Sequence, residues 1–322
     1  MAMKSWCWVA DGHGAAQPRA IDRAGAKAVD HGFVWCHLDG RLTEERAWLD
    51  AESGLEPAII NALTAVETRP RAEAVGDGAL INMRGLGLTP DDDPDPLVSV
   101  RIWAEKGRVI SVGFRHLAAT DVVHAMMQSG RVRDPGDLIA ALAMAITETL
   151  DIEIAALGDT VDTCEADLDP DRIFAMRRTI AQARSAAIQY RRFVAPQRQA
   201  LERLAALEMD WLEEDDRLHL RDAADRFARM AEELEAVRER AALLHEQLTD
   251  LRAEQIETRT LTISIVALVF LPLTFLTGLL GMNVKGIPYA EAPWAFWGVV
   301  GVSAALAVVI TAYFLRAHWF RG

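Results

Sequence analysis

The chain has 322 residues, of which 51% are hydrophobic and 25% are charged, and its formal net charge is −13 at pH 7. An acidic surface repels the phosphate backbone, so we do not expect nucleic acid as a partner. The eight histidines are dispersed. No G-x-S-x-G nucleophile motif, phosphate loop or dinucleotide fingerprint occurs, so we expect no enzyme activity.

Residues 1–130 are predicted to form an α/β domain. Strands are expected where β-branched and aromatic residues are enriched between Gly, Asp and Pro, at 5–11, 32–40, 78–88, 97–105 and 108–114. The last two strands flank Lys106 and Gly107 as the arms of a hairpin do. Two helices are expected between the strands, over 42–53 and 56–67.

The opening residues and the cysteines indicate a cytosolic location for this domain. Residues 1–14 show neither a charged leader before an apolar stretch nor a small-residue cleavage site, so we expect no secretory signal. Cys7, Cys36 and Cys164 are an odd number and lack C-x-x-C spacing. In a reducing compartment, this predicts ordinary packed or surface thiols.

Residues 131–260 are predicted to form a helical stalk. Two antiparallel helices are expected over 136–168 and 171–209. In a third helix, apolar residues recur at alternating spacings of three and four, which requires packing against other helices. These are Leu220, Ala223, Phe227, Met230, Leu234, Val237, Ala241, Leu244, Leu248 and Leu251. No Gly or Pro interrupts residues 220–271, so the helix is expected to continue to residue 282, over about 95 Å. Shorter helices can cover part of the stripe, and we expect self-association to bury the rest.

Two transmembrane helices are predicted at the end of the chain. Residues 261–282 and 292–315 contain no charged side chain, and each run exceeds the roughly 20 residues that span a bilayer. Arginines flank the pair on the outside, whereas the short intervening loop, 283–291, carries only Lys285 and Glu291. The positive-inside rule then predicts a periplasmic loop, a cytosolic tail over 316–322 and cytoplasmic N- and C-termini.

A stripe of small and polar residues follows the first span. It consists of Thr260, Ser264, Ala267, Leu271, Thr274 and Gly278. Such a stripe is typical of close helix packing in lipid, or it lines a water-filled pore with Leu271 as an apolar constriction. Pro272 can bend the helix beside that constriction. No Asp, Glu, His or Cys lies between residues 261 and 290, so an ion passing here is expected to keep much of its hydration shell.

The triplet Gly281-Met282-Asn283, following "LPLTFLTGLL" and closing the first span, resembles the signature of the CorA superfamily of divalent-cation transporters. The resemblance covers essentially the whole chain. It implies an α+β membrane protein of the bacterial inner membrane, a homopentameric funnel whose long helix lines the pore. "TRPR" at 68–71, "DGALINMRGLGL" at 77–88 and "GIP" at 286–288 look like the ZntB zinc-transporter branch, although that branch often has a β-branched residue in place of Met282.

The resemblance also suggests roles for single residues. Gly281 allows the helix to turn, and Asn283 offers an amide oxygen to a hydrated cation, so that five copies would ring the outer mouth. Helix capping is the alternative for both residues. "RDAAD" at 221–225 resembles the stalk segment where magnesium channels place an acid of a regulatory intersubunit metal site, which makes Asp222 a candidate ligand. A solvated surface acid is the alternative there.

The sequence therefore predicts a pentamer in contact with lipid that transports a divalent cation, zinc first, with magnesium, cobalt or nickel as the alternative. No tightly bound cofactor is expected. A membrane-anchored coiled-coil sensor or scaffold is a second alternative, in which the two spans serve only as a tether.

Overall fold

The computed structural model describes residues 5–14, 16–21, 28–29, 31–66, 69–88, 95–169, 172–282, 287, 289 and 291–319. Residues 1–245 form one compact unit and residues 246–322 form another. The division of the chain at residues 130 and 260 stays a prediction. The long helix α6, Glu214–Leu280, belongs to both units.

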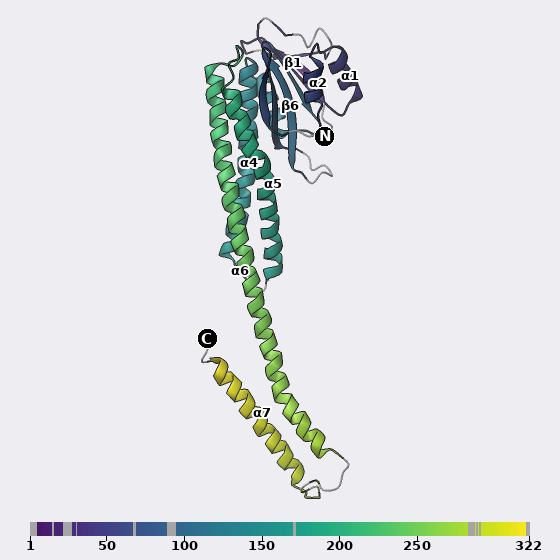
Figure 1. The fold of residues 1–322 in the computed structure, drawn as a ribbon, viewed down its shortest axis with the longest axis vertical. Helices are drawn as coiled ribbons and strands as arrows, with labels where there is room; N and C mark the ends of the chain where they lie inside the picture. Colours follow the sequence, from purple (N-terminus) through teal and green to yellow (C-terminus); the bar gives the residue numbers. More distant parts are fainter. Residues whose placement is uncertain are drawn as a thin grey trace. The chain divides into compact units, whose positions relative to one another are not determined.

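A seven-stranded sheet with the order β2-β1-β3-β7-β6-β5-β4 organises the first unit (Figure 1). The strands are β1 Trp6–Ala10, β2 Ala16–Arg19, β3 Phe33–Asp39, β4 Arg71–Val75, β5 Gly78–Leu86, β6 Leu97–Glu105 and β7 Arg108–Gly113. Only the β3–β7 pair is parallel. All five predicted strands are present, including the β6–β7 hairpin around Gly107, whose φ is 72°. The short strands β2 and β4 were not predicted.

Helices cover both faces of the sheet. On one face, α1 (Thr43–Ala51) and α2 (Pro57–Leu63) bury a core that includes Leu38, Leu63 and Trp103. On the other face lie α3 (Ala118–Gln128) and the start of α4 (Pro135–Ala166). There a Cβ on Gly85 would come within 3.0 Å of Ile146, so only glycine lets α4 pack this closely against β5.

The structure corrects the interpretation of two cysteines. Cys7 on β1 lies directly opposite Cys36 on β3 in antiparallel register, with 4.1 Å between their Cα atoms, and the two are joined in a disulfide. The register brings them together across 29 residues of chain. Cys164 is a free thiol, as predicted.

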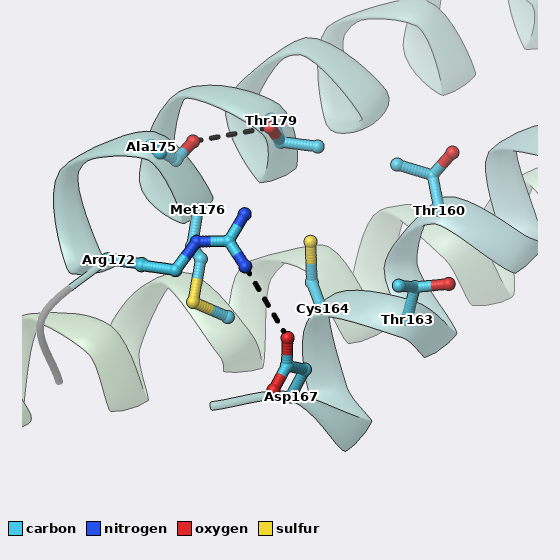
Figure 2. A pocket seen from close by; sticks show the side chains of 8 residues that line it. All are labelled: Thr160, Thr163, Cys164, Asp167, Arg172, Ala175, Met176 and Thr179. Atoms are coloured by element: carbon cyan, nitrogen blue, oxygen red, sulfur yellow. Dashed lines mark hydrogen bonds and ion pairs between the residues drawn. The ribbon is translucent and has the colours of Figure 1, made fainter. Parts of the chain in front are cut away.

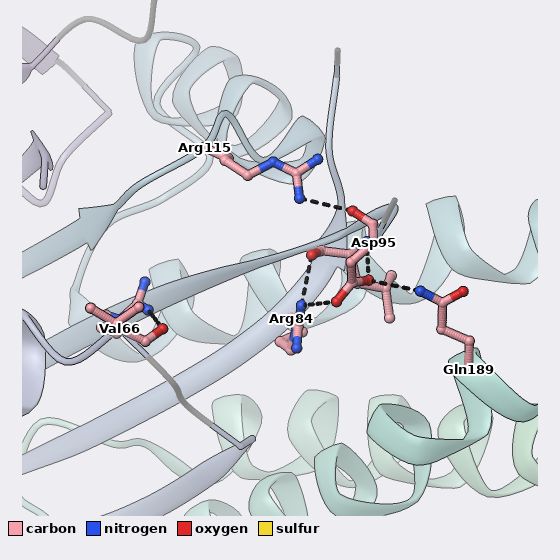
Figure 3. Close-up of polar contacts among 7 residues, drawn as sticks. Val66, Arg84, Asp95, Arg115 and Gln189 are labelled. Atoms are coloured by element: carbon pink, nitrogen blue, oxygen red, sulfur yellow. Dashed lines mark hydrogen bonds and ion pairs between the residues drawn. The ribbon is translucent and has the colours of Figure 1, made fainter. Parts of the chain in front are cut away.

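Helix α5 (Ile173–Ala205) is anchored to the sheet by a buried amide. Gln197 accepts a hydrogen bond from the backbone N–H of Arg84 at 2.8 Å and donates one to the carbonyl of Arg84 at 2.9 Å. Strand β4 begins at Arg71, opposite Asn82, so beyond that point Gln197 takes the place of a strand partner for β5. Figure 3 shows Arg84 paired with Asp95 at 2.7 Å in the same region.

The apolar stripe of the long helix is buried, as its periodicity predicts. All its members from Leu220 to Leu248 are at most 2% exposed. They are covered within one chain by α4 and α5, because Gly158 of α4 lies against Val237 and Arg191 of α5 pairs with Glu235 at 3.1 Å. Shorter helices were expected to cover part of the stripe and self-association to bury the rest; the hairpin of α4 and α5 covers all of it but Leu251, which is half-covered.

The second unit consists of the membrane half of α6 and helix α7, Ala295–Trp319. Both are long and apolar enough to cross a membrane, and neither is buried by the rest of the chain. Figure 1 shows α7 running back antiparallel to α6. Two transmembrane helices were predicted at this place in the chain.

Candidate functional site

The small and polar stripe of the first span lies on one side of α6. At 100° per residue, Thr260, Ser264, Ala267, Leu271, Thr274 and Gly278 fall within an arc of about 80°. All six are exposed in the single chain, and Leu271 is 74% exposed. A Cβ on Gly278 would meet no atom within 4 Å. Nothing in the described part of one chain covers this side of the helix.

The half-covered positions of the same segment lie on the opposite side. They are Ile265, Val269, Pro272, Leu273, Leu276 and Leu280. Their mean direction is about 170° from that of the stripe. On α7 the half-covered positions recur in the same way, at Ala295, Val299, Ser303, Leu306, Ala307, Ile310 and Phe314. This is the pattern of two helices that face each other, so packing against α7 does not account for the small residues of the stripe.

The hydroxyl groups of the stripe bond to their own helix. Ser264 donates to the carbonyl of Thr260 and Thr274 donates to that of Phe270, each at 2.8 Å. A hydroxyl that donates its hydrogen in this way still has lone pairs directed outward. The stripe therefore presents neutral oxygen acceptors, and its only large apolar side chain is Leu271.

Two residues adjust the backbone of this segment. Pro272 lies inside α6 and has no N–H for the carbonyl one turn earlier, which weakens the helix directly beside Leu271. Gly281 follows the last helical residue, Leu280, and its N–H bonds to the carbonyl of Thr277 at 2.9 Å. A helix-ending turn at Gly281 is thus present.

The remaining predicted site residues are placed less fully. Met282 is 47% exposed, and Asn283 lies outside the described residues, so its role at the outer mouth stays a prediction. Asp222 is a half-exposed acid of α6 that pairs with Arg226 at 3.1 Å. Within the described ranges, no three His, Cys, Asp or Glu side chains are grouped to hold a metal ion. A metal site at Asp222 remains a prediction.

An aromatic group near the start of α7 was not noted in the sequence. Tyr289 and Trp294 have ring centroids 5.3 Å apart, and Phe296 and Trp297 follow at 5.4 Å from each other. All four are at least 60% exposed in the single chain. Such residues are enriched where a helix meets the membrane–water interface. Their position beside an apolar run of about 20 residues was the signal that could have identified them.

Known proteins are similar to this chain over most of its length. Zinc transport protein ZntB of Pectobacterium carotovorum subsp. carotovorum is 33% identical over 286 residues, which cover 88% of this chain and 87% of that protein. Divalent cation transporter CmaX of Pseudomonas aeruginosa is 32% identical over 289 residues, covering 89% and 87%.

Solved structures agree with the sequence comparison. The structure of full-length CmaX is 29% identical, with a TM-score of 0.77 and 99% of both chains covered. The CorA magnesium transporter of Methanocaldococcus jannaschii is only 16% identical, but it has the same fold, with a TM-score of 0.78 over 98% of each chain. The family described as CorA-like Mg2+ transporter protein matches residues 30–316. This match and the relatives at 33% and 32% identity show that the chain, with its N-terminal sheet, long helix and two terminal apolar helices, belongs to the CorA-like family.

Proposed function

We propose that this protein carries divalent metal cations across the bacterial inner membrane through a pore lined by α6 of five copies. The observation that supports it is the stripe from Thr260 to Gly278, which is free on the side of α6 opposite to the α7-facing positions. A ring of copies with α7 outside would direct this stripe to a common axis. Zinc is the first candidate cargo, because the ZntB relatives match 88% of the chain. Magnesium, cobalt or nickel is the second, given the family description and CmaX.

The chemistry of the stripe suits an ion that keeps its water. Removing the hydration shell of a divalent ion requires carboxylate, imidazole or thiolate ligands, and residues 261–290 contain none. Hydroxyl and carbonyl oxygens can instead accept hydrogen bonds from the bound water. Leu271 then forms an apolar constriction, which resists the passage of ions until it becomes wet.

The ends of the path complete the proposal. Gly281, Met282 and Asn283 would form the outer mouth, where five amide oxygens attract a hydrated cation without holding it. Arg259 before the first span and Arg316 after the second favour cytoplasmic termini. Metal ions and lipid are then the external partners, and no resident cofactor is needed.

The test is a comparison of two leucines on opposite sides of α6. Leu271→Ser should ease wetting of the constriction and raise the flux of zinc or magnesium into liposomes at matched protein content. Leu273→Ser is the matched control, because Leu273 is half-covered on the α7-facing side and should act through packing alone. Equal effects of the two changes would count against the pore assignment.

The same assay separates the alternatives. Uptake of zinc and of magnesium, each with and without an imposed pH gradient, identifies the cargo and any coupling to protons. A membrane-anchored sensor or scaffold predicts no flux of either ion from the wild-type protein.

A further inference from the structure

Charge is divided unequally between the two helices of the α4–α5 hairpin. Helix α4 contains seven acidic residues and no Lys or Arg, whereas α5 contains seven arginines and the single acid Glu202. Two neighbouring antiparallel helices of opposite charge would be expected to pair with each other. The structure shows a different arrangement.

Within one chain, these charges do not pair across the hairpin. The buried residues of both helices are mostly apolar, among them Ile154, Val161 and Ile180, all at most 1% exposed. The ion pairs of Asp162 and Arg191 are made with α6. Among the residues that the structure describes, no ion pair reaches Glu148 or Asp159 on α4, or Arg178 or Arg192 on α5.

These four charges surround exposed isoleucines. On α4, Ile152 is 71% exposed and lies with Glu148 and Asp159 inside an arc of about 40°, which we call the acidic face. On α5, Ile188 is 50% exposed and lies with Arg178 and Arg192 inside an arc of about 80°, which we call the basic face. Each face thus has an apolar residue between two like charges, and the two signs are opposite.

The hairpin also sets these residues at matching heights. Arg172 pairs with Asp167 at 3.6 Å, and Met176 and Thr179 line one cavity with Thr163 and Thr160 (Figure 2). Pairing Arg172 with Asp167, Met176 with Thr163 and Thr179 with Thr160 gives the same sum of residue numbers each time, as expected for facing residues of two antiparallel helices. Continued along the hairpin, this register places Arg192 level with Glu148, Ile188 level with Ile152, and Arg178 within about two residues of Asp159.

We propose that the basic face of α5 docks on the acidic face of α4 in the next copy of this chain. A rotation about an axis parallel to the hairpin keeps heights unchanged, so it sets Arg192 beside Glu148, Ile188 on Ile152 and Arg178 beside Asp159. Such a contact joins two different surfaces, and repeated rotation closes it into a ring. The inference rests on the ring assembly of the proposed function and names the surfaces that form it. Opposite charges also fix the register and exclude contacts between like faces.

Cross-linking tests the contact directly. The Ile152→Cys and Ile188→Cys variants, each in a Cys164→Ser background, are co-expressed and oxidised in the membrane. We expect a covalent dimer, which can form only between different copies. Gln182→Cys replaces Ile188→Cys in the control, because Gln182 is exposed on α5 about 120° around the helix from Ile188. A dimer with Gln182→Cys but not with Ile188→Cys would overturn the proposal.

Charge reversal tests the energetics. Arg178→Glu with Arg192→Glu should lower the fraction of assembled rings in native mass spectrometry, and adding Glu148→Arg with Asp159→Arg should restore it. Arg198→Glu is the control, since Arg198 is exposed about 120° from Arg192 and pairs with Glu202 of its own helix.

The outcomes separate the interface from the function. Rings that persist in the reversed variant, or a fourfold variant that fails to assemble, would overturn this interface while the pore proposal stands. A wild-type protein without rings would overturn both. Loss of binding to anionic-lipid vesicles by the Arg178→Glu, Arg192→Glu variant, with rings intact, would instead make the basic face a lipid-binding surface.

Discussion

Raising the pH from 5 to 8 should destabilise the first unit through one buried carboxyl group. Asp216 lies in the first turn of α6, is 2% exposed and accepts a hydrogen bond from the N–H of Glu213 at 2.9 Å. Burial raises its pKa to about 7, the hydrogen bond from Glu213 opposes this, and the charges of Asp134 and Asp137 raise it further. The folded chain therefore holds this proton far more tightly than the unfolded chain does.

The size of the effect follows from the two pKa values. A rise from 3.8 to about 7 is worth at most about 4 kcal/mol at 1.36 kcal/mol per pKa unit, of which about 3 kcal/mol is lost between pH 5 and 8. Because the folded-state pKa is the higher one, this stabilisation is complete below pH 4 and is lost as the pH rises through 7. Burial also raises the pKa of Asp134, so its contribution has the same sign.

Urea unfolding of the full-length protein in detergent, followed by tryptophan fluorescence at pH 5 and pH 8, measures the loss. Asp216→Asn keeps the shape of the side chain but cannot ionise, so the difference between the two pH values should shrink. Asp215→Asn is the matched control, because Asp215 is exposed in the same turn. If both variants keep the full wild-type difference, the assignment to Asp216 is refuted.

Three further changes test other parts of the structure. Leu244 is 2% exposed within one chain, so Leu244→Lys should lower the free energy of unfolding by several kcal/mol. Oligomers should then be lost only because the chain no longer folds. A folded monomer, seen by circular dichroism and native mass spectrometry, would contradict this. Gln197→Ala should lower the free energy of unfolding by about 2–4 kcal/mol and speed hydrogen exchange of the Arg84 N–H, because the N–H and the carbonyl of Arg84 both lose a hydrogen-bond partner. Unchanged hydrogen exchange at Arg84 would argue against this anchor. If Asn283 lines the proposed outer mouth, Asn283→Ala should sharply reduce flux in liposomes with the oligomer intact, and Asn283→Asp should tighten cation binding and slow release. Wild-type transport by Asn283→Ala would show that residues 281–283 only end the helix.

The stalk shows what periodicity can and cannot predict. The alternating spacing from Leu220 to Leu248 identified the buried side of α6 residue by residue. It could not identify which helix packs against α6, because a heptad stripe can be buried equally by a helix of the same chain or of another chain. The decisive contacts, such as Gly158 against Val237, join residues 79 positions apart.

The same limit applies to the sheet. Strands rich in β-branched residues were predicted, whereas β2, with the sequence AQPR, and β4, with RAEAV, have no such signal. Both are set by pairing with a neighbour that is itself a clear strand. The Cys7–Cys36 pair and the Gln197 anchor likewise depend on register and tertiary contact, which composition and spacing do not contain.

The sequence of α6 repeats with a heptad count both before and within the first span. Counting in sevens, the buried positions of Leu220 and Ala223 recur in the second unit as the half-covered positions Val269 and Ile265. The positions of Thr260 and Ser264 are continued backward by exposed residues, of which seven are acidic, one is basic and four are uncharged. The acids are Asp222, Asp225, Glu232, Glu239, Glu246, Asp250 and Glu257, the base is Arg229, and the others are Leu218, Ala236, Leu243 and Ala253. This heptad row is acidic before the first span and neutral within it, and because a heptad count drifts by about 20° every seven residues, the row winds slowly around α6. In the proposed pore, an acidic row would raise the local concentration of cations before the neutral stripe, and a neutral stripe would release them. On this register Asp222 contributes as one charge of a row, and a specific metal site is not needed to explain its position.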